Sequence, residues 1–252
     1  MPPRSRLDGI VIRQQPVRDA DLIVALVTAD HGRVDVLARG GRKSTKRFSG
    51  GISLFAEISA IIEHGRGHLP TLVESTRHAA YLTAAPNYPQ LALASYVVEL
   101  AAHASQPDHA DSALHGWLRA SLALCETVDE RDLRTPRLAL EVGFLQAVGV
   151  FPDVQSCCRC GRSTAHGGTW QDADAGLACA ACLPLGAEAL PAALVRALAL
   201  WSLAPAEPPV APLPAVPGLQ LAQRRVASLL AQVVPPSLPA AAAVRELQRL
   251  ER

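Results

Sequence analysis

Four cysteines arranged as two C-x-x-C pairs are the residues of this sequence best suited to a defined chemistry. Eighteen residues separate the two pairs, and the four residues are Cys157, Cys160, Cys179 and Cys182. Two C-x-x-C pairs at this separation are typical of a zinc ribbon or knuckle, in which four thiolates surround the metal. Because protein ligands then fill all four coordination positions, no position remains for an activated water. We therefore predict one structural zinc ion per chain.

Two other uses of these cysteines have to be weighed against a zinc site. They could be buried or form disulfides, but the N-terminus lacks the apolar stretch of a secretory signal, so a reducing compartment is expected. Cys158 could pair with Cys160 instead, although a C-x-C chelate is tighter and breaks the symmetry with the second pair. We expect Cys158 and Cys125 to be spectators, and residues 167–170 to form a short hairpin between the two halves.

A cluster of basic residues lies in a glycine-bracketed segment, residues 38–51, which we predict to be a loop between two strands. The segment contains both lysines of the protein, and from residue 31 to 47 six Lys or Arg oppose the single Asp35. Charges on such a loop can reach phosphates without being buried, so we predict contact with nucleic-acid backbone. The alternative is a solvated loop that only aids solubility. The candidate DNA-binding residues are Arg33, Arg39, Arg42, Lys43, Lys46 and Arg47, with Arg33 the weakest.

The charge is distributed unevenly along a chain whose formal net charge is only +1. Residues 1–80 hold twelve Lys or Arg against eight Asp or Glu, whereas residues 81–252 hold twelve against fifteen. Affinity for nucleic acid therefore has to come from the first third. Aromatic residues make up only 4% of the chain, so base stacking should be minor beside phosphate contact, and binding should be independent of base sequence.

Signatures of catalysis and of membrane insertion are missing from the sequence. It contains no P-loop, G-x-S-x-G, H-E-x-x-H or zinc-deaminase motif, and its eight histidines are scattered. It also has no run of about 18 apolar residues that could span a bilayer. We expect a soluble cytoplasmic protein that is not an enzyme and has no membrane partner.

The first eighty residues have the pattern of a small β-structure. Five strands are predicted, at residues 6–13, 21–28, 33–39, 52–63 and 69–76. The fourth is the most regular, because apolar side chains alternate with polar ones from Ile52 to Glu63, with Phe55 and Ile61 as the exceptions. Five short antiparallel strands avoid open edges by closing, so an OB-type barrel is favoured, with an SH3-like barrel as the alternative.

Helical periodicity begins after Pro86 and continues to the C-terminal region. Two core-facing helices are predicted before residue 126, and a third begins at Thr135 as its cap, with Pro136 in the first turn, and ends near Gly149. Two more helices are predicted around residues 194–201 and 226–233, and six prolines in residues 205–217 predict an extended crossing between them.

The fold class is accordingly α+β. We predict an N-terminal five-stranded OB-type β-barrel at residues 1–80, followed by an α-helical domain at residues 81–252 into which a four-cysteine zinc segment, residues 153–188, is inserted.

The order of these parts resembles a known family. Ala-Arg-Gly-Gly-Arg-Lys leads to Ile-Ser-Leu-Phe in the barrel, and Gln-Ala-Val-Gly-Val-Phe-Pro stands ahead of Cys-x-x-Cys-Gly and the second Cys-x-x-Cys. This arrangement is similar over the whole chain to the bacterial RecO family of recombination mediators.

The resemblance implies a function and a set of partners. A member of this family would bind single- and double-stranded DNA, anneal complementary strands, and act with RecR to help RecA displace single-strand-binding protein during DNA repair. It would be cytoplasmic and associated with the nucleoid, and RecA would be an indirect partner. A competing interpretation is a zinc-ribbon module of transcription or ribosome function that binds RNA or protein.

Overall fold

The computed structural model describes residues 2–65, 67–129, 133–171, 176–183, 189–203, 218–235 and 238. The chain divides into two compact units, Met1–Thr127 and Val128–Arg252, which are described separately below. The domain boundary expected at residue 80 stays a prediction. The expected crossing at residues 205–217 and the Ala-rich C-terminal segment lie outside the described residues.

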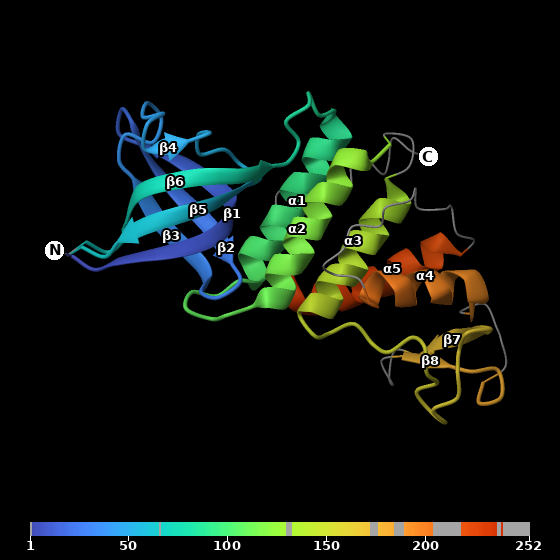
Figure 1. Cartoon of the computed structure of the whole chain (residues 1–252). Helices are drawn as coiled ribbons and strands as arrows, with labels where there is room; N and C mark the ends of the chain where they lie inside the picture. Colours follow the sequence, from blue (N-terminus) through green and yellow to red (C-terminus); the bar gives the residue numbers. More distant parts are fainter. Residues whose placement is uncertain are drawn as a thin grey trace. The chain divides into compact units, whose positions relative to one another are not determined.

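A closed β-barrel forms the N-terminal part of the first unit (Figure 1). The sheet has the strand order β3-β2-β1-β5-β6-β4, and β3 also pairs with β6, where Leu37 lies opposite Thr71 and donates its N–H to the Pro70 carbonyl at 2.9 Å. This closure of five principal strands is that of an OB-fold, as predicted. The strands are β1 (Arg4–Val17), β2 (Asp21–Thr28), β3 (Gly32–Ala38), β4 (Phe48–Ser49), β5 (Ala56–Glu63) and β6 (Thr71–Ala80).

Strand β5 shows why the barrel was recognisable, and where the prediction was wrong. Its buried residues, at positions 56, 58, 60 and 62, alternate with half-buried ones and contribute to the barrel core. The strand begins at Ala56 and not at Ile52, because Phe55 has a φ of 63°, a left-handed conformation that interrupts extended backbone. The sequence pattern also missed β4, whose two residues are too few to show a period; its Phe48 is completely buried in the barrel core.

Two helices complete the first unit, and both were predicted. Helix α1 (Tyr88–Ala104) begins with a capping box between Asn87 and Gln90, and helix α2 (Ser112–Thr127) packs against it. The apolar stripes predicted for these helices, which include Leu93 and Trp117, are buried. Residues of α1 contact β1 and residues of α2 contact β2, so the helix pair lies beside the barrel (Figure 1).

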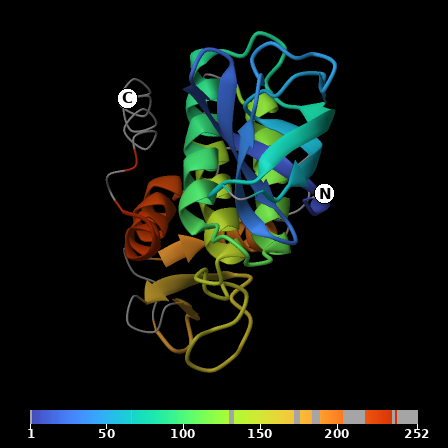
Figure 2. The same ribbon diagram turned by 90° about the vertical axis from the view of Figure 1, so that its left-hand side faces the viewer.

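In its described residues, the second unit combines three helices with a three-stranded sheet. Helix α3 (Arg134–Ala147) contacts both α4 (Ala192–Leu203) and α5 (Leu219–Val233), and β7 (Gly167–Gln171) lies between β8 (Gly176–Ala178) and β9 (Ala189–Pro191). In Figure 2 these strands, in gold and orange, lie at one end of this unit. None of the helices in the described ranges is long and apolar enough to cross a bilayer.

The start of α3 differs from the prediction. Its N-cap residue is Leu133, which makes no side-chain capping hydrogen bond, and Thr135 lies inside the first turn with only 1% of its surface exposed. Burial of the Thr135 side chain explains the error, because a sequence pattern does not distinguish a buried threonine from a capping one. Pro136 does occupy the first turn, where its missing N–H costs no helical hydrogen bond.

Candidate metal centre and nucleic-acid interface

The first C-x-x-C pair is held by a tight turn. The Cys157 N–H donates to the Arg162 carbonyl at 2.7 Å, and the Gly161 N–H donates back to the Cys157 carbonyl at 2.9 Å. Gly161 has a φ of 71°, a conformation that glycine adopts without steric cost. The turn therefore directs the side chains of Cys157 and Cys160 toward the same side, which is the conventional geometry of a zinc knuckle.

The second pair follows strand β8, and the β7–β8 hairpin brings it to the first. In the hairpin, which was predicted, Thr169 lies opposite Ala178, the residue before Cys179. The N–H groups of Cys182 and Leu183 both donate to the Cys179 carbonyl, at 2.9 and 3.0 Å. The Cys158 N–H donates to the Leu177 carbonyl at 2.8 Å, which joins the first turn to the hairpin.

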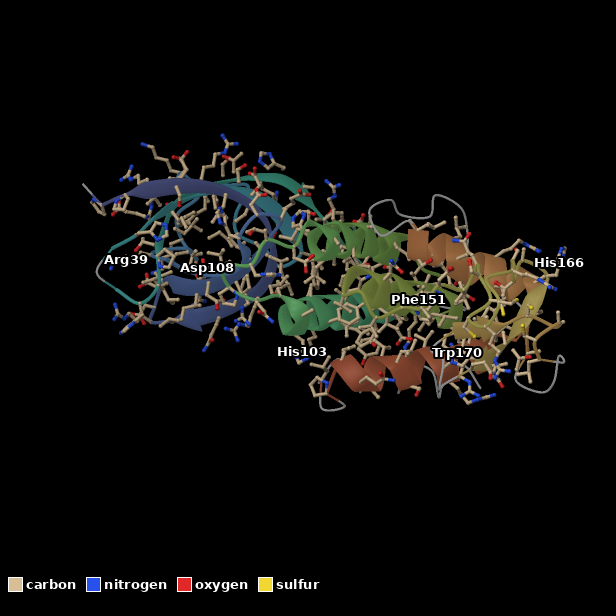
Figure 3. The ribbon with its side chains drawn as sticks, turned by 90° about the horizontal axis from the view of Figure 1, so that it is seen from below. Arg39, His103, Asp108, Phe151, His166 and Trp170 are labelled. Carbon is tan, nitrogen blue, oxygen red and sulfur yellow. The ribbon has the colours of Figure 1, made fainter. Side chains whose placement is uncertain are left out.

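The sulfur atoms of the four predicted cysteines form one cluster, near His166 in Figure 3. All four Sγ atoms lie within 4.8 Å of one another, and the Sγ atoms of Cys160 and Cys179 are 3.7 Å apart. A tetrahedral zinc ion with Zn–S bonds of about 2.3 Å requires sulfur separations of about 3.8 Å. The donor type, number and spacing therefore fit a tetrahedral thiolate-binding metal ion.

Hydrogen bonds within the cluster favour thiolates at two of the four positions. The backbone N–H groups of Cys179 and Arg159, at 3.2 and 3.4 Å from the Cys157 sulfur, lower the pKa of Cys157 to about 6. The backbone N–H of Cys182 lowers the pKa of Cys179, whereas the thiol of Cys182, hydrogen-bonded to Cys160, has a pKa raised to about 12. Negative charge is thus favoured at Cys157 and Cys179 over Cys182, and a bound cation would stabilise thiolates in the cluster.

The two remaining cysteines lie outside this cluster, as expected. Cys158 is exposed although its neighbour Cys157 is buried. Cys125 lies in the other unit and is fully buried, and this burial raises its pKa to about 12, so it behaves as a small apolar core residue. In the described part of the chain, the cluster of four is the one group of potential metal ligands gathered at coordinating distance.

Backbone hydrogen bonds fix the shape of the basic loop, residues 39–47. The Gly40 N–H donates to the Asp21 carboxylate at 2.8 Å, and the Arg42 N–H donates to the Ala20 carbonyl at 3.1 Å. The Lys43 and Ser44 N–H groups both donate to the Gly40 carbonyl at 3.0 Å. The loop is therefore anchored to the turn before β2 and folded back on itself. Figure 3 shows Arg39 at the end of the barrel remote from α1 and α2.

The six predicted cations fall into three groups. Within the described ranges, Arg39, Arg42, Lys43 and Lys46 are exposed, and their side chains make no ion pair or hydrogen bond. The Arg33 guanidinium instead pairs with both oxygens of Asp35, at 3.0 and 3.2 Å. Arg47 braces the loop.

The Arg47 guanidinium makes three contacts that hold the loop together. It donates to the Arg39 carbonyl at 2.6 Å and to the Ser44 hydroxyl at 3.3 Å, and it lies 5.1 Å from the centre of the Phe48 ring. Phe48 is completely buried, so its ring anchors the end of the loop and cannot stack on a base. The guanidinium thus connects both ends of the loop to the barrel core.

Strand β6 adds a cation to this region that the sequence pattern did not indicate. Arg77 is exposed and packs over Gly50, where an added Cβ would lie 3.0 Å from the Arg77 Nε. The contact arises because β4 pairs with β6, which places Ser49 opposite Thr76. Arg77 is thirty residues from Arg47 in the sequence. Without knowledge of the pairing between β4 and β6, it could not have been identified as part of this basic region.

Comparison with known proteins finds a family match for both the N-terminal and the C-terminal part of the chain. The family model "Recombination protein O N terminal" matches residues 1–80, and "Recombination protein O C terminal" matches residues 86–208. The chain is 32% identical over 221 residues to the DNA repair protein RecO of Anaeromyxobacter dehalogenans (strain 2CP-1), with 83% of this chain and 85% of that protein covered. It is 30% identical over 194 residues to RecO of Pelobacter propionicus, covering 77% and 78%, and 28% identical over 193 residues to RecO of Myxococcus xanthus, covering 76% and 78%.

Proposed function

The chain belongs to the RecO family of DNA repair and recombination proteins, and from this premise we propose that it is a recombination mediator. In this role it binds single- and double-stranded DNA, anneals complementary strands, and acts with RecR to promote loading of RecA on DNA coated by single-strand-binding protein. It works without a catalytic group, in the cytoplasm and on the nucleoid.

The observation that carries the proposal is the set of four exposed cations on the barrel loop, which have no ion-pair partner among the residues that the structure describes. Arg39, Arg42, Lys43 and Lys46 project from a segment anchored by backbone hydrogen bonds, so they can approach phosphates at little conformational cost to the loop. Binding to phosphates releases condensed counterions, which supplies sequence-independent affinity. Arg77 extends the same charge from β6, whereas Arg33 contributes little because Asp35 already neutralises it.

Annealing follows from this kind of surface. Two complementary strands repel each other, and a cationic surface that holds both backbones lowers that repulsion while leaving the base edges free to pair. Base pairing then supplies the driving force, so no nucleotide cofactor is required. The acidic balance of residues 81–252 favours protein partners for that part of the chain, such as RecR and single-strand-binding protein.

The metal proposed for the four-cysteine cluster is one structural zinc ion. Four thiolates at tetrahedral spacing suit Zn²⁺, which when bound would cross-link the two C-x-x-C turns. The chain's own contribution is to hold the turns through the Cys157–Arg162 and Cys158–Leu177 backbone hydrogen bonds. The alternative, a zinc-ribbon module of transcription or ribosome function, gains no support from the family models, which extend over the barrel as well as the cysteine segment.

The proposed function is tested by an annealing reaction without ATP. Complementary strands coated with single-strand-binding protein are mixed, the purified protein is added, and duplex formation is followed by fluorescence energy transfer between labels on the two strands. We expect faster duplex formation than with single-strand-binding protein alone. A rate that does not change, measured with protein that binds DNA, would exclude the annealing activity; preference for RNA over DNA would support the ribosome or transcription alternative.

A further inference from the structure

A hollow of about 410 Å³ opens beside the basic loop, at the end of the barrel. It lies between the loop and the segment that enters β5. The residues that line it are Gln14, Pro16, Leu22, Gly41, Arg42, Lys43, Ser44, Thr45, Gly51 and Ile52. It is an open hollow and not an enclosed cavity, so a group bound in it would remain partly exposed to solvent. The hollow has room for one ring of a DNA strand.

The lining of the hollow combines two kinds of chemistry. Pro16, Leu22 and Ile52 contribute apolar surface, and Ser44 and Thr45 contribute hydroxyl-bearing side chains. The Arg42 and Lys43 cations, which have no ion-pair partner in the described part of the chain, also line it. A flat apolar ring with polar edges, attached to a nearby anion, is complementary to such a surface. Nucleotides have this composition.

The walls are held in place before any ligand binds. Gln14 donates from its Nε2 to the Ile52 carbonyl at 2.9 Å, which ties Ile52 to β1. The Arg42 N–H donates to the Ala20 carbonyl at 3.1 Å, which anchors the loop residues that line the hollow. Gly51 has a φ of 79°, and an added Cβ there would meet no atom within 4 Å, so the space beside it is open. A site that is formed in advance costs little conformational entropy on binding.

The two phenylalanines nearest the loop in the sequence do not offer an alternative platform for a base. Phe48 is 0% exposed and Phe55 is 6% exposed, so neither ring can present a face to a base. In many single-strand-binding OB-folds a base stacks on an exposed aromatic ring. A base bound at this end of the barrel would instead have to enter a hollow.

We propose that this hollow binds one nucleobase of single-stranded DNA with its sugar, while Arg42 and Lys43 hold the adjacent phosphate. The inference rests on the proposed DNA-binding function and makes it more specific. In a duplex each base is stacked and paired, and its removal costs a few kcal/mol. The hollow therefore favours single strands over duplex, although the loop cations bind both.

The test compares a thymidine oligonucleotide with an oligonucleotide of the same length whose sites are all abasic, so that the two carry equal phosphate charge. We expect the full-length protein to bind the thymidine strand about tenfold more tightly, the effect of burying part of one base. Ile52→Met and Thr45→Leu each place a longer apolar side chain in the hollow without adding a ring on which a base could stack. Both should bring this ratio closer to one, while the dependence of affinity on salt is kept. Thr45 is exposed, so Thr45→Leu leaves the barrel core untouched.

Leu54→Met is the matched control, because Leu54 is 39% exposed and does not line the hollow. It should leave the ratio unchanged. The opposite result is that the wild-type protein binds both oligonucleotides with equal affinity and normal salt dependence. That result would overturn the assignment of the hollow as a base-binding site and leave the proposed DNA binding intact. Failure of both oligonucleotides to bind would overturn the proposed function together with the hollow. Thymidine monophosphate that binds as tightly as the strand would show a site for free nucleotides and overturn the assignment to DNA.

Discussion

The sulfur atoms of Cys160 and Cys179 lie 3.7 Å apart, although eighteen residues separate them in the sequence. Each C-x-x-C turn is formed by residues close together in the sequence. The β7–β8 hairpin and the hydrogen bond from the Cys158 N–H to the Leu177 carbonyl bring the two turns together. In the absence of a metal, such a cluster would concentrate up to four negative charges. A divalent cation removes this repulsion, and structural zinc sites contribute on the order of 10 kcal/mol to folding.

We therefore expect one zinc ion per chain in freshly purified, reduced protein. Cys160→Ser and Cys179→Ser should each lose the metal and unfold the cysteine segment, whereas Cys158→Ser, at an exposed position outside the cluster, should retain it. Metal content measured by inductively coupled plasma mass spectrometry checks both expectations. Retention of stoichiometric zinc by Cys160→Ser, or no zinc in the wild-type protein, would contradict this assignment.

The C-x-x-C pairs could be recognised in the sequence because each is a local pattern with few structural solutions. The barrel was recognisable for a similar reason, since alternation in a segment such as Ala56–Glu63 reports which face is buried. The contact of Arg77 with Gly50 was not predictable, because it depends on pairing between segments distant in sequence. Nor could the sequence separate Arg47 from Lys46: both are exposed cations, and only the loop conformation gives Arg47 its three internal contacts.

Helix α3 contains a buried ion pair whose disruption should be costly. The Glu141 side chain is 2% exposed and accepts a hydrogen bond of 2.6 Å from the Arg137 Nε. Glu141→Ala leaves the guanidinium without this partner, and breaking a buried pair costs about 3–5 kcal/mol. We expect a clearly lower midpoint of urea unfolding for this variant. A midpoint equal to that of the wild-type protein would contradict the role of the pair.

Arg47 should contribute to stability more than to DNA affinity. Its bonds to the Arg39 carbonyl and Ser44 hydroxyl, with the contact to Phe48, are together worth about 1–2 kcal/mol. Arg47→Ala should lower the thermal unfolding midpoint of the protein, whereas Lys46→Ala, which removes an equally exposed cation, should not. Differential scanning calorimetry distinguishes the two, and equal midpoints for both variants would show that the brace is energetically unimportant.

The burial of His115 leads us to expect a specific dependence of stability on pH. Burial lowers its pKa below 6.5, with Arg119 acting in the same direction and Glu57, Asp30 and Asp8 opposing it. Its Nε2 is buried and has no hydrogen-bond partner among the described residues. Because the unfolded state binds the proton more readily, the contribution of neutral His115 is present above about pH 6.5 and is lost as the pH falls toward the lowered value.

His115→Leu should therefore lose less stability than the wild-type protein between pH 7.5 and pH 5.5, because both proteins share every other titrating group. Thermal midpoints at the two pH values measure this difference. Parallel curves for wild type and His115→Leu would mean that the buried imidazole does not couple to folding.

The loop cations should determine how DNA affinity responds to salt. Each phosphate neutralised on a single strand adds about −0.7 to the slope of log affinity against log salt, so four contacts give a slope near −3. Replacing Arg42, Lys43 and Lys46 together by Ala should weaken DNA binding and reduce the magnitude of the slope by about 2. The variant should be as stable as the wild-type protein, because these side chains have no ion pair or hydrogen bond within the described ranges.

Fluorescence anisotropy titrations with a labelled oligonucleotide at several salt concentrations measure the slope. A control variant that removes three exposed arginines elsewhere, Arg162, Arg196 and Arg224, changes the net charge by the same amount and should keep the wild-type slope. If the loop variant keeps that slope too, the phosphates bind at another surface and the loop is only solvated.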